Sequence, residues 1–505
     1  MTAMPAAAEP VLRPAAGLAA ALPGWAWLAL AGLTALRLGI AGTAGLSPDE
    51  TYYWLWSRAL APGYLDHPPM VALWIRAGTA IAGDGAIGIR LLAPIAAALG
   101  TLVLARAAAD LLPDLRPSAR AGLIAAALLN ATLLFGVGAV TMTPDTPLLF
   151  FWTLCLGAMA RLLRTGRGEW WLVAGLACGA ALASKYTGFL LLGGIGLWAL
   201  AAQEGRHWLW RWQPWAGLGL ALLLFAPVLG WNAAHHWASF LRQGGRTEDW
   251  HPARALQFLS ELIGGQFGLA TPLVFVLCVV GVWHAVRRAR RGDAGAALLL
   301  ALTLPGAAVF LQHALGDRVQ ANWPAVLYPA AAIAAAAVAG RWWRPAVALG
   351  FALTALVYLQ ALAAPLPLPA RADVTLARLA GWDGLAQAVV AAARAQHADF
   401  VTAPDYALAA PLAHDLPPGL PVIGYGPRWA YFDLPPAGAT AAGRTGLLVQ
   451  NARRVEAPDP ARWTQVTALG EIARGRHGRV AERYRLFRVT ARPAATGLAL
   501  LPRPR

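Results

Sequence analysis

The sequence predicts an α-helical, polytopic membrane protein with a small α/β domain at its C-terminal end. Of its 505 residues, 58% are apolar and only 13% are charged, about half the charged fraction of an ordinary soluble domain. Apolar runs of about 20 residues, long enough to cross a hydrocarbon core of roughly 30 Å, recur through residues 1–364. Beyond them the charged fraction rises and the apolar runs shorten, which marks a second domain at 365–505.

About eleven of these runs are expected to be transmembrane helices. They cover residues 24–45, 87–111, 121–140, 146–163, 170–184, 186–202, 215–234, 268–286, 295–314, 323–340 and 345–364. The runs at 170–184 and 186–202 are either one broken helix or two short spans that meet at Ser184-Lys185-Tyr186. The first run is too long for the core of a cleaved signal peptide, so we expect it to remain as an anchor.

The placement of arginine predicts the orientation of the spans. Residues 161–167 hold three arginines and residues 287–291 hold four, whereas the acids gather in the alternate loops. A cytoplasmic N-terminus puts the arginine-rich loops inside and, with an odd number of spans, puts the C-terminal domain outside. Much of the formal net charge of +16 is this topological signal, so it does not indicate a nucleic-acid partner.

The C-terminal domain, residues 365–505, shows the patterns of both strands and helices. Phe400-Val401, Leu447-Leu448-Val449 and the run Tyr484–Val489 are rich in β-formers. The run Gly381–Gln396 alternates like an amphipathic helix. About 140 residues are enough for a small α/β domain.

The first external loop, residues 46–86, carries the strongest signs of chemistry. Asp49 and Glu50 are adjacent carboxylates near a low-dielectric boundary, where mutual repulsion raises a carboxyl pKa toward the range of a general base. The structural alternative is a helix start, with Ser47 as the N-cap, Pro48 at the first helical position and both acids favoured by the helix dipole.

The same loop holds Asp66-His67-Pro68-Pro69, whose prolines restrict the backbone after an acid and an imidazole. This pair suits metal binding or substrate positioning, and a capped turn is the alternative. Tyr52 and Tyr53 belong to an aromatic group that suits a groove for a sugar or a lipid head. An interfacial aromatic belt explains any one of them equally well.

Two isolated ionisable residues lie at predicted loop positions beside the spans. Asp145 is a candidate for a second catalytic carboxylate or, with Asp49 and His67, for a ligand of a divalent cation; helix capping is its alternative. Lys185 is the only lysine beside 40 arginines, and a compact ammonium there suits a phosphate oxygen. Tyr186 adds a hydroxyl beside it, and interfacial snorkelling is the alternative for the lysine.

Three further polar residues are candidates for substrate binding. Gln266 and Asn322 could hydrogen-bond a sugar, and Arg318 could pair with a phosphate. Taken individually, each is more often a solvated loop residue. The sequence contains no nucleotide-binding glycine loop or Walker motif, so no nucleotide cofactor is expected.

Together these segments resemble the GT-C superfamily of membrane glycosyltransferases. The bacterial branch of glycosyltransferase family 39, related to protein O-mannosyltransferases and the lipid A aminoarabinose transferase, is the nearest type. The segments that carry the resemblance are DETYYWLWS (49–57), GYLDHPPM (63–70), TPDTP (143–147), SKYTG (184–188), NWP (322–324), DYALAA (405–410) and YFDL (431–434).

The resemblance implies an inverting transferase of the bacterial inner membrane, with its C-terminal domain in the periplasm. Its donor would be a polyprenyl-phosphate sugar and its acceptor a lipid, a glycan or a protein among membrane lipids. Asp49 is the catalytic residue that the resemblance implies. The chain departs from the aminoarabinose type at Tyr52, where that type has an arginine, so donor-phosphate binding is expected of Lys185 or Arg318.

A polytopic transporter or flippase of a lipid-linked or small anionic substrate is the alternative function. Against it, the polar residues gather in external loops rather than at mid-span, and no pair of interrupted helices repeats in two halves. A structural anchor for the C-terminal domain is a third possibility, which leaves the charged first loop unexplained.

Overall fold

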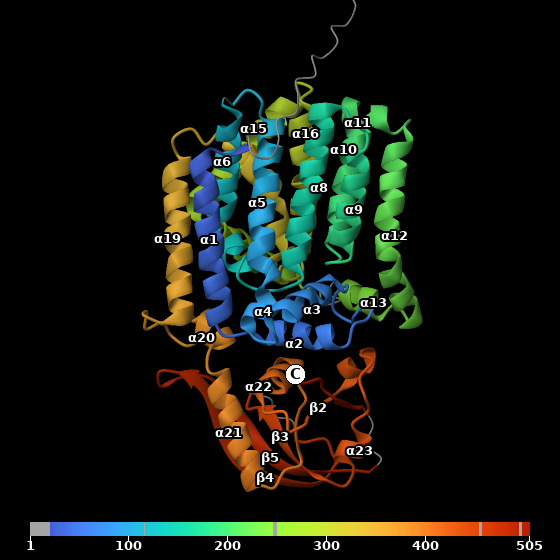
Figure 1. The fold of residues 1–505 in the computed structure, drawn as a ribbon, viewed down its shortest axis with the longest axis vertical. Helices are drawn as coiled ribbons and strands as arrows, with labels where there is room; N and C mark the ends of the chain where they lie inside the picture. The colour runs from blue at the N-terminus through green and yellow to red at the C-terminus, as the bar shows by residue number, and fades with distance from the viewer. Residues whose placement is uncertain (1–20, 116, 246–249, 454–456, 494–496, 505) are drawn as a thin grey trace, which may run out of the picture.

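The N-terminal part of the chain is a helical bundle, with the C-terminal domain below it in Figure 1. The structure, a computed structural model, describes residues 21–115, 117–245, 250–453, 457–493 and 497–504. Within them, seven helical segments are long and apolar enough to cross a membrane, so the chain is a multi-pass membrane protein. They are α1 (Gly24–Thr43), α4 (Ala86–Arg90) continuing into α5 (Leu92–Leu111), α8 (Asp145–Thr165), α12 (Trp212–Ala234), α15 (Pro272–Ala289), α16 (Ala294–Ala301) continuing into α17 (Leu304–His313), and α19 (Trp343–Leu362).

Shorter apolar helices stand beside these segments. They are α6 (Ser118–Asn130), α9 (Trp170–Leu182), α10 (Gly188–Ala201) and α18 (Tyr328–Ala336), which follows the 3₁₀ turn η4 (Trp323–Leu327). The predicted count of eleven spans is not confirmed, because several predicted runs are interrupted. The run at 121–140 breaks where Thr132 accepts from the amide of Phe135 and starts α7 (Leu133–Gly138). The runs around Lys185 are two separate helices, α9 and α10.

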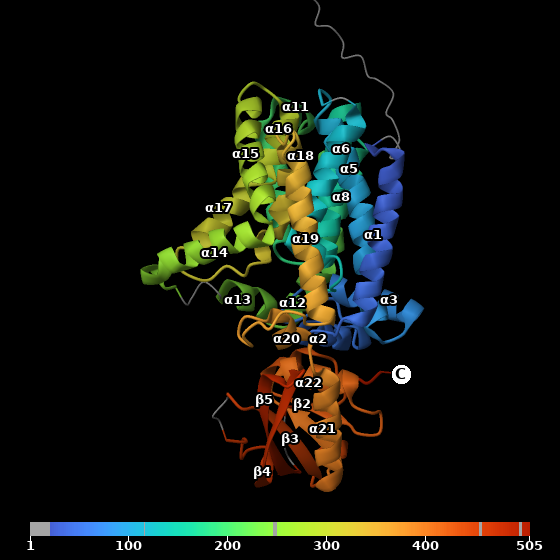
Figure 2. The same cartoon turned by 90° about the vertical axis from the view of Figure 1, so that its left-hand side faces the viewer.

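Short helices cover the end of the bundle that faces the C-terminal domain, which we call the loop face (Figures 1 and 2). They are α2 (Pro48–Arg58), α3 (Met70–Ala82), α13 (Ala238–Gly244) and α20 (Val374–Leu379). At the opposite end lies α11 (Gln203–Trp208), and α14 (Ala255–Leu269), after the turn η3 (Pro252–Arg254), projects sideways in Figure 2.

Helix α2 begins as the capping interpretation predicts. The Ser47 side chain accepts from the amide of Glu50, the Glu50 carboxylate accepts from the amide of Ser47, and Pro48 occupies the first helical position. The aromatic residues that follow are buried rather than belt-like. Trp56 stacks on Tyr64 with ring centroids 4.2 Å apart, and the hydroxyl of Tyr64 donates to the carbonyl oxygens of Trp56 and Ala59.

The C-terminal domain is a six-stranded mixed sheet in the order β4-β5-β3-β1-β2-β6. Its strands are β1 (Phe400–Ala403), β2 (Val422–Tyr425), β3 (Thr445–Asn451), β4 (Trp463–Arg476), β5 (Arg479–Ala491) and β6 (Leu498–Leu500). Strand β1 pairs in parallel with β2 and β3, with Val401 opposite Val422 and Leu447, and the other pairs are antiparallel. The predicted strands lie in β1, β3 and β5.

Three helices and a 3₁₀ turn complete this domain. They are α21 (Trp382–Ala395), which matches the predicted amphipathic helix, α22 (Tyr406–Asp415), α23 (Gly438–Ala441) and the turn η5 (Pro427–Tyr431). Helix α22 packs against α2, and a single hydrophobic cluster contains side chains of both, including Trp54 and Leu408. The C-terminal domain is therefore seated directly on the first loop.

Candidate active site

Asp49 lies on the loop face at the start of α2, between the helical bundle and the C-terminal domain. Its side chain is 41% exposed, and its carboxylate is 3.8 Å from the guanidinium of Arg378. The hydroxyl of Tyr406 donates to it at 3.4 Å. Burial raises the pKa of the Asp49 carboxyl above its usual value, and the two partners only partly oppose this shift. The geometry gives an accessible carboxylate that is a better proton acceptor than an ordinary aspartate.

Glu50, the neighbouring carboxylate, has a different environment. It is fully buried, and Arg90 donates to both of its oxygens at 2.6 and 2.7 Å. Burial alone would raise the pKa of the Glu50 carboxyl, but Arg90 and the amides of Ser47 and Met142 hold it below its usual range. The expectation that Glu50 has a raised pKa is therefore wrong. Its contacts join α2 to α4 and to the segment before α8, which is a structural role.

Asp66 is the centre of a second charged group on the loop face. Its carboxylate pairs with Arg428 of the C-terminal domain and with Arg242 of α13, the latter at 2.7 Å. The hydroxyl of Tyr52 donates to it at 3.0 Å. Burial would raise the pKa of the Asp66 carboxyl, but Arg428, His67 and Arg242 hold it below its usual value. Two guanidiniums share one carboxylate, which leaves a local excess of positive charge.

Arg428 also lies against two tyrosine rings, 4.4 Å from the centroid of Tyr406 and 5.4 Å from that of Tyr52. Tyr406 in turn reaches Asp49, so the groups around Asp49 and Asp66 are connected through the C-terminal domain. Tyr53 and His67 lie beside them, with ring centroids 6.3 Å apart.

Three predicted residues from distant parts of the chain meet in a third group. Lys185 lies 2.7 Å from one oxygen of Asp145, and the side-chain amide of Asn322 donates to the other oxygen at 2.6 Å. The side chains of Asp145 and Lys185 are both largely buried. Lys185 therefore has a carboxylate partner, where the sequence predicted an ammonium left for a phosphate.

Of the remaining candidates, Tyr186 and Gln266 make contacts within the helical bundle, and Arg318 lies apart from the other candidates. The Tyr186 hydroxyl contacts Ser239 at 2.6 Å and links the α9–α10 turn to α13. Gln266 is buried and donates to the carbonyl of Ala321 at 2.9 Å, next to Asn322. Arg318 is 55% exposed and pairs with Glu261, so the structure does not bring it to the other candidates.

The predicted metal ligands are not assembled. Among the described residues, no group of three or more His, Cys, Asp or Glu side chains could hold a metal ion. Asp49, His67 and Asp145 thus do not form the expected site: Asp49 contacts Arg378 and Tyr406, and Asp145 contacts Lys185.

Sequence reasoning missed the basic partners of the acidic residues. Arg90, Arg242, Arg378 and Arg428 all contact first-loop carboxylates from other parts of the chain. Tyr406 was missed as well, although it lies inside one of the segments that carry the family resemblance. The packing of the helices reveals the contacts of Arg90 and Arg242, and the placement of the C-terminal domain reveals those of Arg378 and Arg428. No local pattern distinguishes these four from the other arginines of this arginine-rich chain.

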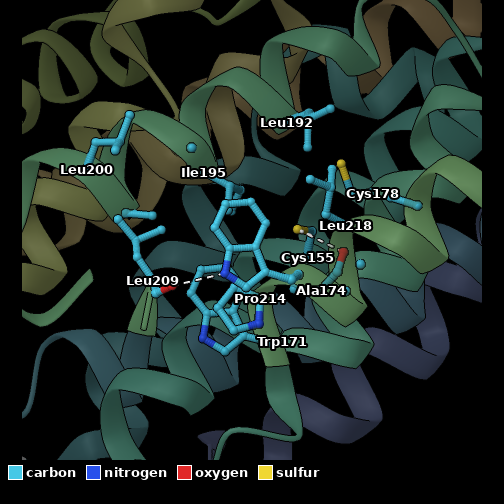
Figure 3. A pocket seen from close by; sticks show the side chains of 16 residues that line it. Cys155, Trp171, Ala174, Cys178, Leu192, Ile195, Leu200, Leu209, Pro214 and Leu218 are labelled. Atoms are coloured by element: carbon cyan, nitrogen blue, oxygen red, sulfur yellow. Dashed lines mark hydrogen bonds between the residues drawn. The ribbon is translucent and has the colours of Figure 1, made fainter. Parts of the chain in front are cut away.

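An apolar cavity of about 230 Å³ lies between α9, α10 and α12, at the end of α9 away from the loop face (Figure 3). Trp171, Cys178, Ile195 and Leu218 line it. The ring nitrogen of Trp215 donates to the carbonyl of Leu209 at its edge, at 2.9 Å. The lining is almost entirely apolar and includes no charged side chain, so this cavity is separate from the charged groups of the loop face.

The chain is similar in sequence to known glycosyltransferases. The family model for dolichyl-phosphate-mannose-protein mannosyltransferases matches residues 66–231. A lipid A galacturonosyltransferase of Rhizobium johnstonii, RgtD, is 28% identical over 306 residues, which are 57% of this chain. The match spans 59% of the length of that relative.

The fold is similar over a larger part of the chain. The crystal structure of ArnT from Cupriavidus metallidurans bound to undecaprenyl phosphate superposes with a TM-score of 0.60 at 17% identity, covering 92% of this chain and 98% of that one. The apo form of the same protein gives a TM-score of 0.57 over the same shares. These matches confirm the predicted fold with its C-terminal sheet domain, and the sequence matches confirm the predicted resemblance to membrane glycosyltransferases.

Proposed function

We propose that the protein is a glycosyltransferase that moves one sugar from a polyprenyl-phosphate-linked donor to a lipid, glycan or protein acceptor at the loop face. The sequence relative is named for sugar transfer to lipid A, and the fold neighbour was crystallised with undecaprenyl phosphate. Both names support a lipid-linked donor and a membrane-associated acceptor for this chain.

The observation that carries the proposal is the environment of Asp49. It is the partly exposed carboxylate of the first loop, its pKa is raised by burial, and Tyr406 orients it. A general base works best when its pKa is shifted toward the working pH and its oxygen stays accessible. Glu50 is not accessible to an acceptor, and the pKa of Asp66 is not raised. Asp49 is therefore the carboxylate best suited to act as the base.

The reaction is a single displacement. Asp49 takes the proton of the acceptor hydroxyl, the acceptor oxygen forms a bond to the anomeric carbon, and the bond from that carbon to the phosphate oxygen breaks. The electron pair leaves with the polyprenyl phosphate, and the configuration at the anomeric carbon inverts. No nucleotide takes part, because the lipid phosphate is the leaving group.

Positive charge near the first loop stabilises the departing phosphate. Arg242 is the candidate that the geometry favours, because its side chain is 42% exposed and it shares Asp66 with Arg428. Lys185 could serve only by sharing its ammonium between the phosphate and Asp145. The donor site is therefore assigned to Arg242 in place of the predicted Lys185 and Arg318.

The setting of the reaction is proposed from the sequence and the relatives together. The arginine distribution favours a cytoplasmic N-terminus and puts the loop face on the outer side of a bacterial inner membrane, with the C-terminal domain in the periplasm. A polyprenyl-phosphate donor presented on that side would reach Arg242 from the bilayer.

The test is sugar transfer by the purified full-length protein in lipid nanodiscs. Polyprenyl-phosphate sugars of several kinds are offered with envelope lipids of a deletion strain, and the products are followed by mass spectrometry. The proposal predicts a new glycosylated product that requires Asp49, with Arg242→Gln raising the half-saturating donor concentration. Parallel reactions with and without a chelator measure any metal requirement. If no donor supports transfer, yet the protein moves lipid-linked sugars between leaflets, the transporter or flippase alternative is correct; the comparisons give that alternative no support.

A further inference from the structure

A cleft of about 640 Å³ lies where the C-terminal domain meets the first loop, and none of the functions proposed above uses it. Its walls come from Arg371 and Arg378 around α20, from Trp382 at the start of α21, from Arg474 and Tyr484 on the sheet, and from Pro48 at the start of α2. Figure 1 shows α20, α2 and α22 gathered at this junction, beside the ends of α1 and α19. The cleft is thus close to the ends of α1 and α19 on the loop face.

One wall of the cleft is rigid. Arg474 is buried, and it donates to the carbonyl oxygens of Ala377 and Ala380 at 2.9 and 2.6 Å. It also lies 4.1 Å from the ring centroid of Trp382, which is buried too. These contacts position the end of α20, the element that carries Arg378, so the guanidinium of Arg378 projects from a fixed support.

The cleft keeps positive charge that its own acids do not neutralise. Arg453 pairs with Glu482 at 3.1 Å. Arg378 is 59% exposed and contacts only the edge of Asp49, at 3.8 Å. Arg371 is exposed, and within the described residues it makes no side-chain hydrogen bond or ion pair. Two guanidiniums, Arg371 and Arg378, are therefore available to an anion.

The cleft also reaches the proposed base, because Pro48 and Arg378 line it and both adjoin Asp49. A donor that is confined to the bilayer approaches from the membrane side, near Arg242. A group in the cleft approaches Asp49 from the side of the C-terminal domain. We infer that the cleft is the acceptor site and that it takes a phosphorylated saccharide, with the phosphate on Arg371 and Arg378 and a sugar hydroxyl at Asp49.

The chemistry of the lining favours this ligand. Guanidinium groups bind phosphate through paired N–H donors, and an exposed arginine loses little hydration when it does so. The polar groups of Asp405 and Asn451 also line the cleft and suit the hydroxyl groups of a sugar. This inference rests on the proposed function for the role of Asp49, but binding to the cleft can be measured without sugar transfer.

The test measures binding to the full-length protein in nanodiscs by native mass spectrometry and acceptor titration. The probes are bisphosphorylated lipid A, its dephosphorylated form and its de-acylated, water-soluble saccharide. Arg371→Glu should weaken binding of both phosphorylated probes about tenfold or more and leave the dephosphorylated lipid and the donor half-saturation unchanged. Arg371→Lys should be intermediate. Arg444→Glu, an exposed arginine elsewhere on the C-terminal domain, is the matched control.

The results distinguish a failure of the acceptor-site inference from a failure of the proposed function. Weaker binding in Arg371→Glu supports the cleft even if no donor supports transfer, in which case the proposed function alone is overturned. Unchanged binding in Arg371→Glu overturns the acceptor site even if the wild-type protein transfers sugar. The inference is equally overturned if Arg444→Glu has the same effect, if phosphatidylglycerol shows the same loss, or if the wild-type protein binds neither phosphorylated probe.

Discussion

Arg90 holds both carboxylate oxygens of Glu50 across 40 residues of sequence, and both side chains are almost completely buried. Arg90 also donates to the carbonyl oxygens of Ala41 and Ala44 at 3.0 and 2.7 Å, where α1 ends. One guanidinium thus ties the end of the first span, the start of the first loop and α4 together. The Asp49 carboxylate is positioned by this arrangement because it is the residue next to Glu50.

This ion pair should contribute strongly to the stability of the protein. Glu50→Ala or Arg90→Ala should destabilise the protein by about 3–5 kcal/mol, because each leaves a buried charge without its partner. The paired change Glu50→Gln with Arg90→Met should recover part of the loss. Thermal unfolding in detergent, monitored by size-exclusion chromatography, measures the loss in the single variants and the recovery in the paired variant. A Glu50→Gln protein that is as stable as wild type but inactive would return Glu50 to the catalytic group.

Asp49 should be required for transfer but not for folding. Asp49→Asn keeps the shape of the side chain and removes the proton acceptor, which costs about 10²–10⁴ in rate. Its contacts are long and its side chain is partly exposed, so the unfolding temperature should stay close to wild type. Asp383→Asn, at an exposed position of α21, is the control. Near-normal turnover in Asp49→Asn would contradict the assignment.

The same carboxylate sets the pH dependence of the rate. Because burial raises the pKa of Asp49, the base becomes protonated at a higher pH than an ordinary aspartate, whose pKa is about 3.9. The rate should therefore fall on acidification through a pKa above that value. Tyr406→Phe removes a hydrogen bond that stabilises the charged form, so it should move the midpoint further upward. A pH–rate profile in which Tyr406→Phe moves the midpoint downward would contradict this account.

Lys185, Asp145 and Asn322 should act as one unit. Lys185→Ala and Asp145→Ala should each lower the stability, and the double change should cost less than their sum, with a coupling of about 0.5–3 kcal/mol. Donor titration tests the alternative, in which Lys185 binds the donor phosphate. If Lys185→Ala raises the half-saturating donor concentration while Arg242→Gln leaves it unchanged, the sequence-based assignment of the phosphate to Lys185 is right.

His414 should make the packing of the C-terminal domain against the first loop pH-dependent. Its ring contacts the Asp415 carboxylate at 2.6 Å and the carbonyl oxygen of Asp84 at 2.9 Å, and it packs edge-on against Trp54. Burial would lower the pKa of His414, but Asp415 and Asp84 raise it overall above its usual value. Two cations are nearby: Arg58 pairs with Asp84 at 3.1 Å, and Arg503, which donates to the carbonyl of Leu412, interacts with Asp415.

A base whose pKa is raised by folding stabilises the folded state while it is protonated. This contribution is complete below about pH 6.5 and is lost as the pH rises through the folded-state pKa. Proteolysis between α19 and α20 should therefore become faster from about pH 6 to about pH 8. His414→Gln should flatten this dependence; an equally steep dependence in the variant would assign it to another group.

The proposed orientation is tested by enzyme fusions. Alkaline phosphatase, which is active only outside the cytoplasm, should be active when fused after Arg371 and inactive when fused after Arg291. The positive-inside distribution of arginine is the physical reason. The reverse pattern would place the loop face in the cytoplasm, where the proposed donor arrangement fails.

Local rules predicted much of this molecule. The start of α2 at Ser47 and Pro48, the helix after Gly381 and the strands around Val401 and Leu447 follow from capping, amphipathicity and β-propensity. The breaks at Thr132 and Thr303 were not predicted, because hydropathy reports the length of an apolar run and not the continuity of its helix.

The candidate site was predicted as a set of residues but not as a set of contacts. Asp145 and Lys185 were each singled out, yet their pairing across 40 residues is a property of the packed helices. Asn322 lies 177 residues from Asp145 and completes the same group. Arg428 reaches Asp66 over 362 residues, and only the position of the whole C-terminal domain determines that contact.

The close crossing of α9 and α12 has a mechanical consequence. A Cβ at Gly175 would lie 2.1 Å from the carbonyl oxygen of Gly217, so the two backbones touch and the helices must move together. The 230 Å³ cavity lies beside this crossing, because Gly175, Gly217 and Ile195 of α10 all line it. Helix α10 is held on its other side by α16: a Cβ at Gly194 would lie 2.6 Å from the carbonyl oxygen of Ala301, and the ring nitrogen of Trp198 donates to the carbonyl of Ala294 at 3.1 Å. Spin labels on α9 and α12 should show a single, narrow range of separations, as expected for two helices in backbone contact.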